Sequence, residues 1–126
     1  MKYLAAVLTA ASVMFAVDTV SAAGDAIKGK KVYNKCRACH ALVAGKRKIG
    51  PSLSKIFGRM AGTEKYNYSK AMKKAGKKGL VWNEETLKKY LTSPRKFVPG
   101  NRMPFVGLKK AVDRDNLMAY LKKATK

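Results

Sequence analysis

The sequence places both of its cysteines and its only histidine within five consecutive residues, Cys36-Arg37-Ala38-Cys39-His40. Two thiols separated by two residues, with an imidazole directly after the second, form the pattern C-x-x-C-H. If two Cys and one His were placed at random in the chain of 126 residues, this arrangement would arise roughly once in eight thousand placements. The motif constrains the fold more than any other feature, because the chain has no further Cys or His from which to build a different site.

The C-x-x-C-H pattern is the attachment signature of c-type haem. Its spacing lets the two thiols reach the two vinyl groups of one porphyrin, while the adjacent imidazole meets the iron. A thioredoxin-like dithiol needs a βαβ context that this sequence lacks, and a structural zinc site normally needs four Cys or His ligands. A simple disulfide leaves the adjacent His40 unexplained. The sequence therefore predicts one haem c per chain, attached covalently through Cys36 and Cys39.

A second iron ligand must come from a residue other than histidine, and a methionine sulfur is a suitable donor. Met103 lies between two nearby prolines, which restrict the backbone and can hold a thioether at a fixed place. His40 and Met103 are therefore the predicted ligands. The other methionines after residue 23 are weaker candidates, because one falls in a helical segment, one among lysines and one in a Gly-flanked loop: Met118, Met72 and Met60.

The first 23 residues have the layout of a secretory signal. A basic residue, Lys2, precedes an apolar stretch over residues 4–17, and small residues follow at 21–23. The stretch is shorter than the ~20 residues that a membrane-spanning helix needs. An uncleaved anchor or a buried core helix accounts less well for the small residues at its end. We therefore expect residues 1–23 to be removed on export to the periplasm and residues 24–126 to form one domain.

The chain is strongly basic, with 28 Lys and Arg against 7 Asp and Glu and a formal net charge of +21. Removal of residues 1–23 would take away one basic and one acidic residue, so the remaining domain keeps this charge. Acidic surfaces, nucleic acid and anionic lipid all fit such a charge. The basic residues are spread along the chain instead of being gathered on a recognition motif, which disfavours nucleic acid.

The periodic segments of the sequence are helical, and no stretch alternates polar and apolar residues long enough to indicate a sheet. Asp25 is expected to cap a first helix that runs to the cysteine motif. Asn83 is expected to cap a second helix that Pro94 ends, and Asp113 to cap a third.

A weaker helix is expected to begin at Ser69 and to fail at Gly76 and Gly79. Long loops are expected over residues 44–62 and 93–107, which are rich in Gly and Pro. The predicted fold class is all-α with long loops, and loops of this length in a small domain usually wrap around something.

With these features the sequence resembles the class I c-type cytochromes, of the mitochondrial cytochrome c and bacterial cytochrome c2 type. The resemblance covers nearly all of residues 24–126 and implies the small cytochrome c fold, with three to five helices and long loops around one covalent haem. The matching positions occur in the right order: Gly24-Asp25, Lys28 to Tyr33, Lys35 to His40, Gly50 to Leu53, Phe57 to Arg59, Tyr66 to Tyr68, Trp82 to Leu87, Tyr90-Leu91, Pro94, Pro99 to Met103, Phe105, Gly107 and Leu117 to Thr125.

The resemblance also implies roles for residues around the haem. The carbonyl of Pro51 would accept a hydrogen bond from the His40 ring. Tyr90 would lie near the Met103 sulfur, and Phe105 would cover the exposed haem edge. The residues expected to meet the haem propionates are Arg59, Tyr68, Trp82 and Asn101. The residues expected at the crossing of the first and last helices are Gly29, Tyr33, Leu117 and Tyr120.

The predicted function is that of a soluble one-electron carrier, not an enzyme. Ligation by His and Met keeps iron six-coordinate in both oxidation states, so an electron moves with little bond rearrangement. The expected partners are acidic docking surfaces of respiratory or photosynthetic proteins: a cytochrome bc1-type donor or a periplasmic dehydrogenase, and an oxidase or reaction centre as acceptor. The chain is expected to be a monomer that touches the membrane surface only through these complexes. The basic residues expected to steer docking are Lys35, Arg95, Lys96, Arg102, Lys109 and Lys110.

Two other functions remain open from the sequence. An enzyme with a five-coordinate haem, acting on peroxide or binding a small gas, requires that Met103 not ligate, and it lacks a distal His. A basic nucleic-acid or membrane-surface binder leaves the C-x-x-C-H motif without a role. A visible and near-infrared spectrum of the purified protein distinguishes both from a carrier.

Overall fold

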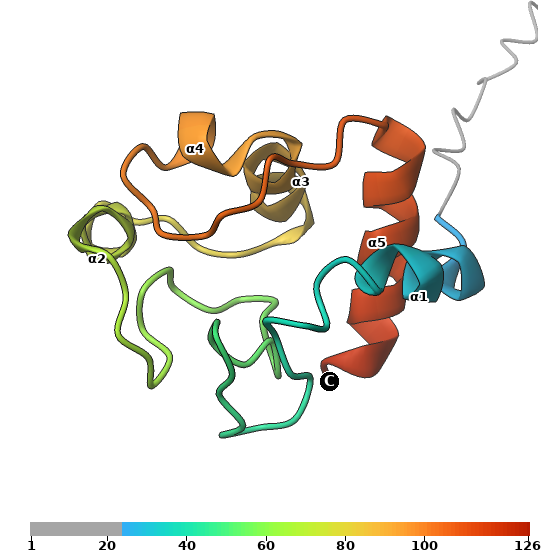
Figure 1. Cartoon of the computed structure of the whole chain (residues 1–126), viewed down its shortest axis with the longest axis horizontal. Helices are drawn as coiled ribbons and strands as arrows, with labels where there is room; N and C mark the ends of the chain where they lie inside the picture. Colours follow the sequence, from blue (N-terminus) through green and yellow to red (C-terminus); the bar gives the residue numbers. More distant parts are fainter. Residues whose placement is uncertain (1–23) are drawn as a thin grey trace, which may run out of the picture.

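The computed structural model describes residues 24–126, and the predicted signal segment 1–23 lies outside the described residues. Within the described part the chain forms five helices and no strand, apart from an isolated bridge between Met60 and Val81. The all-α fold class is therefore confirmed for residues 24–126. None of these helices is long and apolar enough to cross a membrane. In chain order they are α1 (Ala26–Tyr33), α2 (Lys70–Lys77), α3 (Glu84–Thr92), α4 (Pro94–Phe97) and α5 (Ala111–Ala124) (Figure 1).

Three helices begin at their predicted capping residues. The side chain of Asp25 accepts hydrogen bonds from two backbone N–H groups in the first turn of α1, at 2.8 and 3.1 Å. Ser69 caps α2 in the same way, at 3.1 Å. Asn83 and Thr86 exchange two hydrogen bonds of 2.9 Å in a capping box at the start of α3. These bonds satisfy backbone donors that have no partner inside the helix.

Two predictions about the C-terminal half are wrong. α5 begins at Ala111 with Lys110 as its N-cap, so Asp113 is not the cap. Asp113 lies instead in the first turn, where its negative charge interacts favourably with the helix dipole. The segment 93–107 is not a loop throughout, because Pro94 starts α4. Proline suits the first helical position, since the N–H that it lacks would be unpaired there.

α2 continues through Gly76 instead of ending there, which corrects a third prediction. A Cβ atom at position 76 would lie 1.8 Å from the carbonyl oxygen of Ala61. The absence of a side chain therefore allows α2 to pack directly on the backbone near residue 61, and this packing outweighs the low helix propensity of glycine. The helix ends at Lys77, shortly before Gly79, whose φ of +100° suits glycine.

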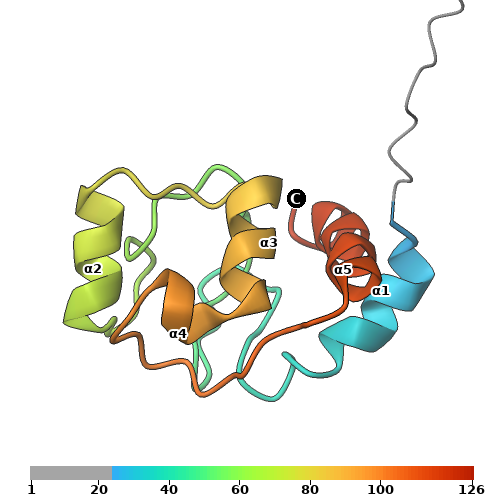
Figure 2. The same ribbon diagram turned by 90° about the horizontal axis from the view of Figure 1, so that it is seen from above.

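α1 and α5 cross at one end of the molecule, although they are the first and last helices of the described chain (Figures 1 and 2). A Cβ atom at Gly29 would lie 1.9 Å from the carbonyl oxygen of Asn116, so glycine is required at this contact. The rings of Tyr33 and Tyr120 lie 5.5 Å apart. The side chain of Asn116 also accepts a hydrogen bond from the backbone N–H of Asp25, at 2.8 Å. The expected crossing of these two helices is confirmed.

α2 lies at the end of the molecule opposite to α1 and α5, with α3 and α4 between them (Figure 2). The loops over residues 40–69 complete the side of the domain below these helices in Figure 1. The buried side chains of these elements form one apolar cluster, made up of Tyr33, Ile56, Ala61, Met72, Trp82, Leu87, Tyr90, Val98, Leu108, Leu117, Met118 and Leu121.

Candidate functional site

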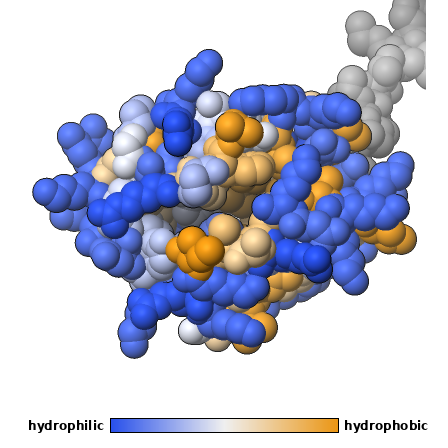
Figure 3. Space-filling view, viewed as in Figure 1, coloured by the Kyte–Doolittle hydropathy of each residue, from blue (hydrophilic) through white to orange (hydrophobic). Residues whose placement is uncertain are grey.

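A cavity of about 270 Å³ opens between these helices and loops. Figure 3 shows a hollow in this face, with apolar side chains beside it and hydrophilic side chains around it. Residues from α1, α2, α3, α5 and the loops between them line the cavity. The structure brings together in this lining every residue that the sequence predicts for cofactor binding: Cys36, Cys39, His40, Pro51, Arg59, Tyr68, Trp82, Tyr90, Asn101, Met103 and Phe105.

Cys36 and Cys39 lie in a turn that follows α1. The carbonyl of Cys36 accepts hydrogen bonds from the N–H groups of Cys39 and His40, at 3.1 and 2.9 Å. The two cysteines form no disulfide with each other, and both line the cavity. Burial raises the pKa of Cys36 to about 11, with a further increase from Cys39 and a smaller opposing effect of Lys35. The turn thus presents two half-buried thiols to one space.

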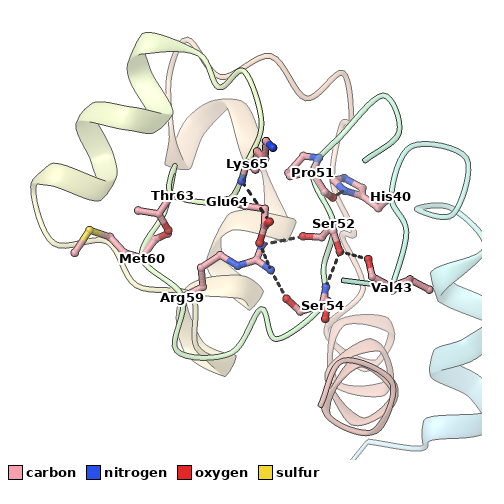
Figure 4. Close-up of polar contacts among 10 residues, drawn as sticks. All are labelled: His40, Val43, Pro51, Ser52, Ser54, Arg59, Met60, Thr63, Glu64 and Lys65. Carbon is pink, nitrogen blue, oxygen red and sulfur yellow. Dashed lines mark hydrogen bonds and ion pairs between the residues drawn. The ribbon is translucent and has the colours of Figure 1, made fainter. Parts of the chain in front are cut away.

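The orientation of the His40 ring is fixed by the backbone around it. Its Nδ1 donates a hydrogen bond to the carbonyl oxygen of Pro51, at 2.7 Å (Figure 4). Because a carbonyl oxygen only accepts, Nδ1 carries the proton and Nε2 keeps its lone pair. Burial lowers the pKa of His40, and the Pro51 bond opposes this effect only in part. Tyr33 donates to the His40 carbonyl at 2.9 Å, and a Cβ atom at Gly50 would lie 2.5 Å from the ring.

Met103 lies in a segment that side chains hold in place. Its backbone N–H donates to the side chain of Asn101, at 2.8 Å. The amide nitrogen of Asn101 in turn donates to the carbonyls of Pro94 and Val98, at 2.9 and 2.8 Å. The hydroxyl of Tyr90 donates to the Met103 sulfur at 3.9 Å, and burial raises the pKa of Tyr90 to about 12. A neutral phenol therefore faces the thioether at ordinary pH.

Arg59 occupies the polar side of the cavity. Its Nη1 donates to the carbonyl oxygen of Ser52 at 2.8 Å, and its Nη2 donates to the carbonyl oxygen of Ser54 (Figure 4). The side chain of Glu64 forms an ion pair with Arg59, at 3.2 Å between Nη2 and Oε2. Only 11% of the Arg59 side chain is exposed, so Arg59 is not an ordinary surface residue.

Two aromatic residues line the cavity beside Arg59. Trp82 is buried, and its ring lies 4.9 Å from the ring of Tyr90. Tyr68 is half-buried, and burial raises the pKa of its hydroxyl. The ring of Tyr66 packs on that of Tyr68 at 5.1 Å.

Sequence reasoning assigned no role to four residues in or beside this site. Tyr66 and Met72 line the cavity, and Ser52 and Glu64 contact Arg59. Met72 is buried in the cavity lining, and its position in α2 offers a signal. It shares one helix face with Gly76, four residues later, while the lysines of α2 occupy the opposite face. Ser52, Glu64 and Tyr66 make contacts between irregular segments, for which the sequence carries no periodic pattern.

The predicted docking residues are all exposed, but they differ in their distance from the cavity. Lys35 and Arg102 belong to its lining. The others lie outside the lining, on α4 or in the segment before α5: Arg95, Lys96, Lys109 and Lys110.

The comparisons with known proteins all match cytochromes c. A family model described as Cytochrome c matches residues 26–125. Cytochrome c2 of Agrobacterium tumefaciens (strain II Chrys) is 50% identical over 100 residues, which cover 78% of this chain and 90% of the relative. Cytochrome c of Chlamydomonas reinhardtii is 48% identical over 106 residues, which cover 82% of this chain and 92% of that protein. The solved structure of cytochrome cH from Methylobacterium extorquens has a TM-score of 0.72 at 39% identity, over 79% of this chain and 99% of that chain.

Proposed function

The chain belongs to the cytochrome c family, and on this basis we propose that Cys36 and Cys39 attach a haem c whose iron His40 and Met103 ligate. Members of this family are electron carriers, not enzymes, and they bind haem c covalently. The observation that carries our assignment of residues is the convergence of two thiols, an imidazole and a thioether on one cavity.

The chemistry of these donors fits the cofactor. The neutral ring of His40 keeps a lone pair on Nε2, because its Nδ1 proton is held by the Pro51 carbonyl. Two thiols three positions apart match the two attachment points of a porphyrin. Most of the remaining lining is apolar, and Arg59 supplies a cation that two propionate groups need. The bound haem supplies one-electron chemistry, since its iron changes oxidation state by one.

The surrounding residues prepare this site by holding both ligands in place. Pro51 fixes the rotation of the His40 ring, while Asn101 and Tyr90 fix the backbone and sulfur of Met103. Ligands that need not move when the oxidation state changes keep the reorganisation small, which favours fast electron transfer.

We further assign the propionate side of the haem to Arg59, Tyr68, Trp82 and Asn101, and the cover of its edge to Phe105. Arg59 has the strongest support, because its buried charge lines the cavity. Asn101 contributes through its loop, since backbone carbonyls already engage its amide nitrogen.

The partners that we propose are acidic surfaces of redox proteins. The formal charge of +21 favours rapid encounter with them. Lys35 and Arg102 lie where such a surface would contact the cavity, and Arg95, Lys96, Lys109 and Lys110 would extend the contact. A cytochrome bc1-type complex or a periplasmic dehydrogenase would donate the electron, and an oxidase or reaction centre would accept it from the monomeric carrier.

Our proposal for location is the periplasm, after removal of residues 1–23. The support is the three-part pattern of this segment, together with a cytochrome c2 of a bacterium among the similar proteins. N-terminal sequencing of the purified protein tests it, and a mature chain that begins at Met1 would contradict it.

The deciding experiment for the ligand assignment is a visible and near-infrared spectrum of the purified holoprotein. We expect a low-spin oxidised spectrum with a methionine-to-iron charge-transfer band, and loss of that band in Met103→Ala. Met60→Ala is the matched control, because Met60 is 46% exposed and does not line the cavity, and this variant should keep the band. A high-spin oxidised wild-type protein without the band would overturn the assignment and favour the five-coordinate enzyme.

A further inference from the structure

Glu64 pairs with a nearly buried arginine that has no other carboxylate partner among the described residues. The Arg59 and Glu64 side chains are only 11% and 28% exposed, and their ion pair is 3.2 Å long. A guanidinium at such a depth is costly unless a carboxylate and further acceptors surround it. Glu64 therefore stabilises the position of Arg59 more than an exposed partner would.

Backbone structure brings the two residues together. The segment at Arg59 pairs with the segment at Trp82, through hydrogen bonds of 2.8 Å from Trp82 N–H to the Arg59 carbonyl and 2.7 Å from Gly58 N–H to the Trp82 carbonyl. The chain then turns at Gly62, whose φ is +74°. Thr63 closes this turn by donating to the Met60 carbonyl at 2.6 Å. The turn returns Glu64 to the side of Arg59 (Figure 4).

Arg59 connects its ion pair with Glu64 to the segment 51–54. Its two terminal nitrogens donate to the carbonyls of Ser52 and Ser54. Ser52 is 2% exposed, and its hydroxyl donates to the Val43 carbonyl at 2.7 Å while it accepts from the Ser54 N–H at 3.1 Å. The segment is thus fixed from Arg59 on one side and from the loop at residue 43 on the other.

The same segment contains the residue that orients the proposed histidine ligand. Pro51 directly precedes Ser52, and its carbonyl accepts the Nδ1 proton of His40 at 2.7 Å. A continuous set of contacts therefore runs from Glu64 through Arg59 and Ser52 to Pro51 and His40 (Figure 4). Arg59 does not touch the Pro51 carbonyl itself; it holds the carbonyls of Ser52 and Ser54, which follow Pro51 in the same segment. The position of the Pro51 carbonyl in turn affects the orientation and basicity of the imidazole that bonds to it.

We propose that Glu64 is a positioning residue for His40, acting through Arg59 and the segment 51–54, and that it sets the charge that Arg59 presents to the haem cavity. This inference rests on the proposed function, because it takes His40 as an iron ligand. Loss of the Glu64 charge has two consequences, and both raise the reduction potential. It removes one negative charge from beside Arg59, so the cavity becomes more positive, and it weakens the support of the Pro51 bond; both changes disfavour the oxidised haem.

The test compares Glu64→Gln with wild type in the purified holoprotein. Glu85→Gln is the matched control, because Glu85 also forms an ion pair, with Lys89 at 2.7 Å, but is exposed and has a partner that lies outside the cavity lining. Two quantities are measured: the midpoint reduction potential and, by NMR of the reduced protein, the His40 Nδ1–H resonance and its exchange with solvent. A role confined to stability would leave both unchanged.

In Glu64→Gln we expect the reduction equilibrium constant to rise by about two- to fivefold. We also expect a shifted Nδ1–H resonance whose proton exchanges faster than in wild type. Glu85→Gln should match wild type in both measurements, and Glu64→Asp should restore the wild-type values at least in part.

A Glu64→Gln protein with unchanged potential and an unchanged Nδ1–H resonance would overturn the inference, whatever its melting temperature. The spectrum of the wild-type protein tells whether the role of Glu64 or the proposed function is wrong. If the wild type shows the His and Met ligation expected above and Glu64→Gln has no effect, only the role of Glu64 is wrong. If the wild type lacks that ligation, the proposed function itself fails.

Discussion

The α1–α5 crossing and the loop segment over residues 40–69 are held together by different means. At the crossing, backbone packs on backbone, since a Cβ atom at Gly29 would lie 1.9 Å from the carbonyl of Asn116. In the loop segment, side chains reach across to carbonyls, as Ser52 does to Val43 at 2.7 Å and Tyr66 to Ile49 at 2.6 Å. The crossing thus depends on the lack of a side chain at Gly29, whereas the loop segment depends on individual hydrogen bonds. Substitutions should therefore lower the free energy of unfolding by different amounts in the two regions.

The largest effect is expected for Gly29→Val. The added side chain cannot be accommodated without separating α1 from α5, so we expect the free energy of unfolding to fall by about 4 kcal/mol. Denaturant unfolding of the holoprotein measures this change. Lys30→Val is the matched control, because Lys30 is exposed on the same helix, and it should cost less than about 1 kcal/mol. Equal losses in the two variants would show that the crossing does not depend on close approach.

An intermediate effect is expected for Ser52→Ala in the loop segment. The substitution removes one hydroxyl and leaves the Val43 carbonyl and the Ser54 N–H without this partner, which should cost about 1–2 kcal/mol. The same unfolding experiment applies. Ser54→Ala, whose hydroxyl makes no hydrogen bond in the described part of the chain, should cost less than about 0.5 kcal/mol. If Ser52→Ala lowered the free energy of unfolding as much as Gly29→Val, the proposed difference between the crossing and the loop segment would be wrong.

The smallest effect is expected at an ionic contact that joins α3 to α5. Glu84 accepts hydrogen bonds from Lys122 and Lys88, and these lower its pKa below the ordinary value of 4.5. A lowered pKa stabilises the fold fully above pH 4.5, and this stabilisation is lost as the pH falls through the folded-state pKa. Because the Glu84 side chain is 42% exposed and solvent screens its charge, Glu84→Gln should cost less than about 1 kcal/mol near pH 7.

Unfolding of wild type and Glu84→Gln across acidic pH checks the sign of this dependence. The difference in stability between the two proteins should be largest near neutral pH and should disappear in acid. A difference that grows as the pH falls would mean that Glu84 is not stabilised as a carboxylate.

Local chemistry made much of the fold predictable. Asp25, Ser69 and Asn83 cap helices because their short polar side chains reach donors a few residues away. The cavity lining was predictable in outline because the motif at residues 36–40 and the resemblance around it name most of its members.

Tertiary contacts decided what the sequence could not show. α5 starts before Asp113 because the chain ahead of it is fixed to α3, where the Leu108 N–H donates to the Leu91 carbonyl at 2.6 Å. The side chain of Arg114 also donates a hydrogen bond to the Leu108 carbonyl. Glu64 likewise acquires its position only when a turn folds it onto Arg59, and neither event leaves a pattern in the local sequence.

The contact between Asp25 and Asn116 joins residues that are 91 positions apart, and this bears on the order of events as the chain is made. α1 leaves the ribosome long before the helix on which it packs has been synthesised. The C-x-x-C-H motif occupies only five consecutive residues, so the whole motif is synthesised long before the crossing can form. A chain that stops before residue 116 contains both thiols proposed to attach the cofactor, yet it lacks most of α5, the helix on which α1 packs.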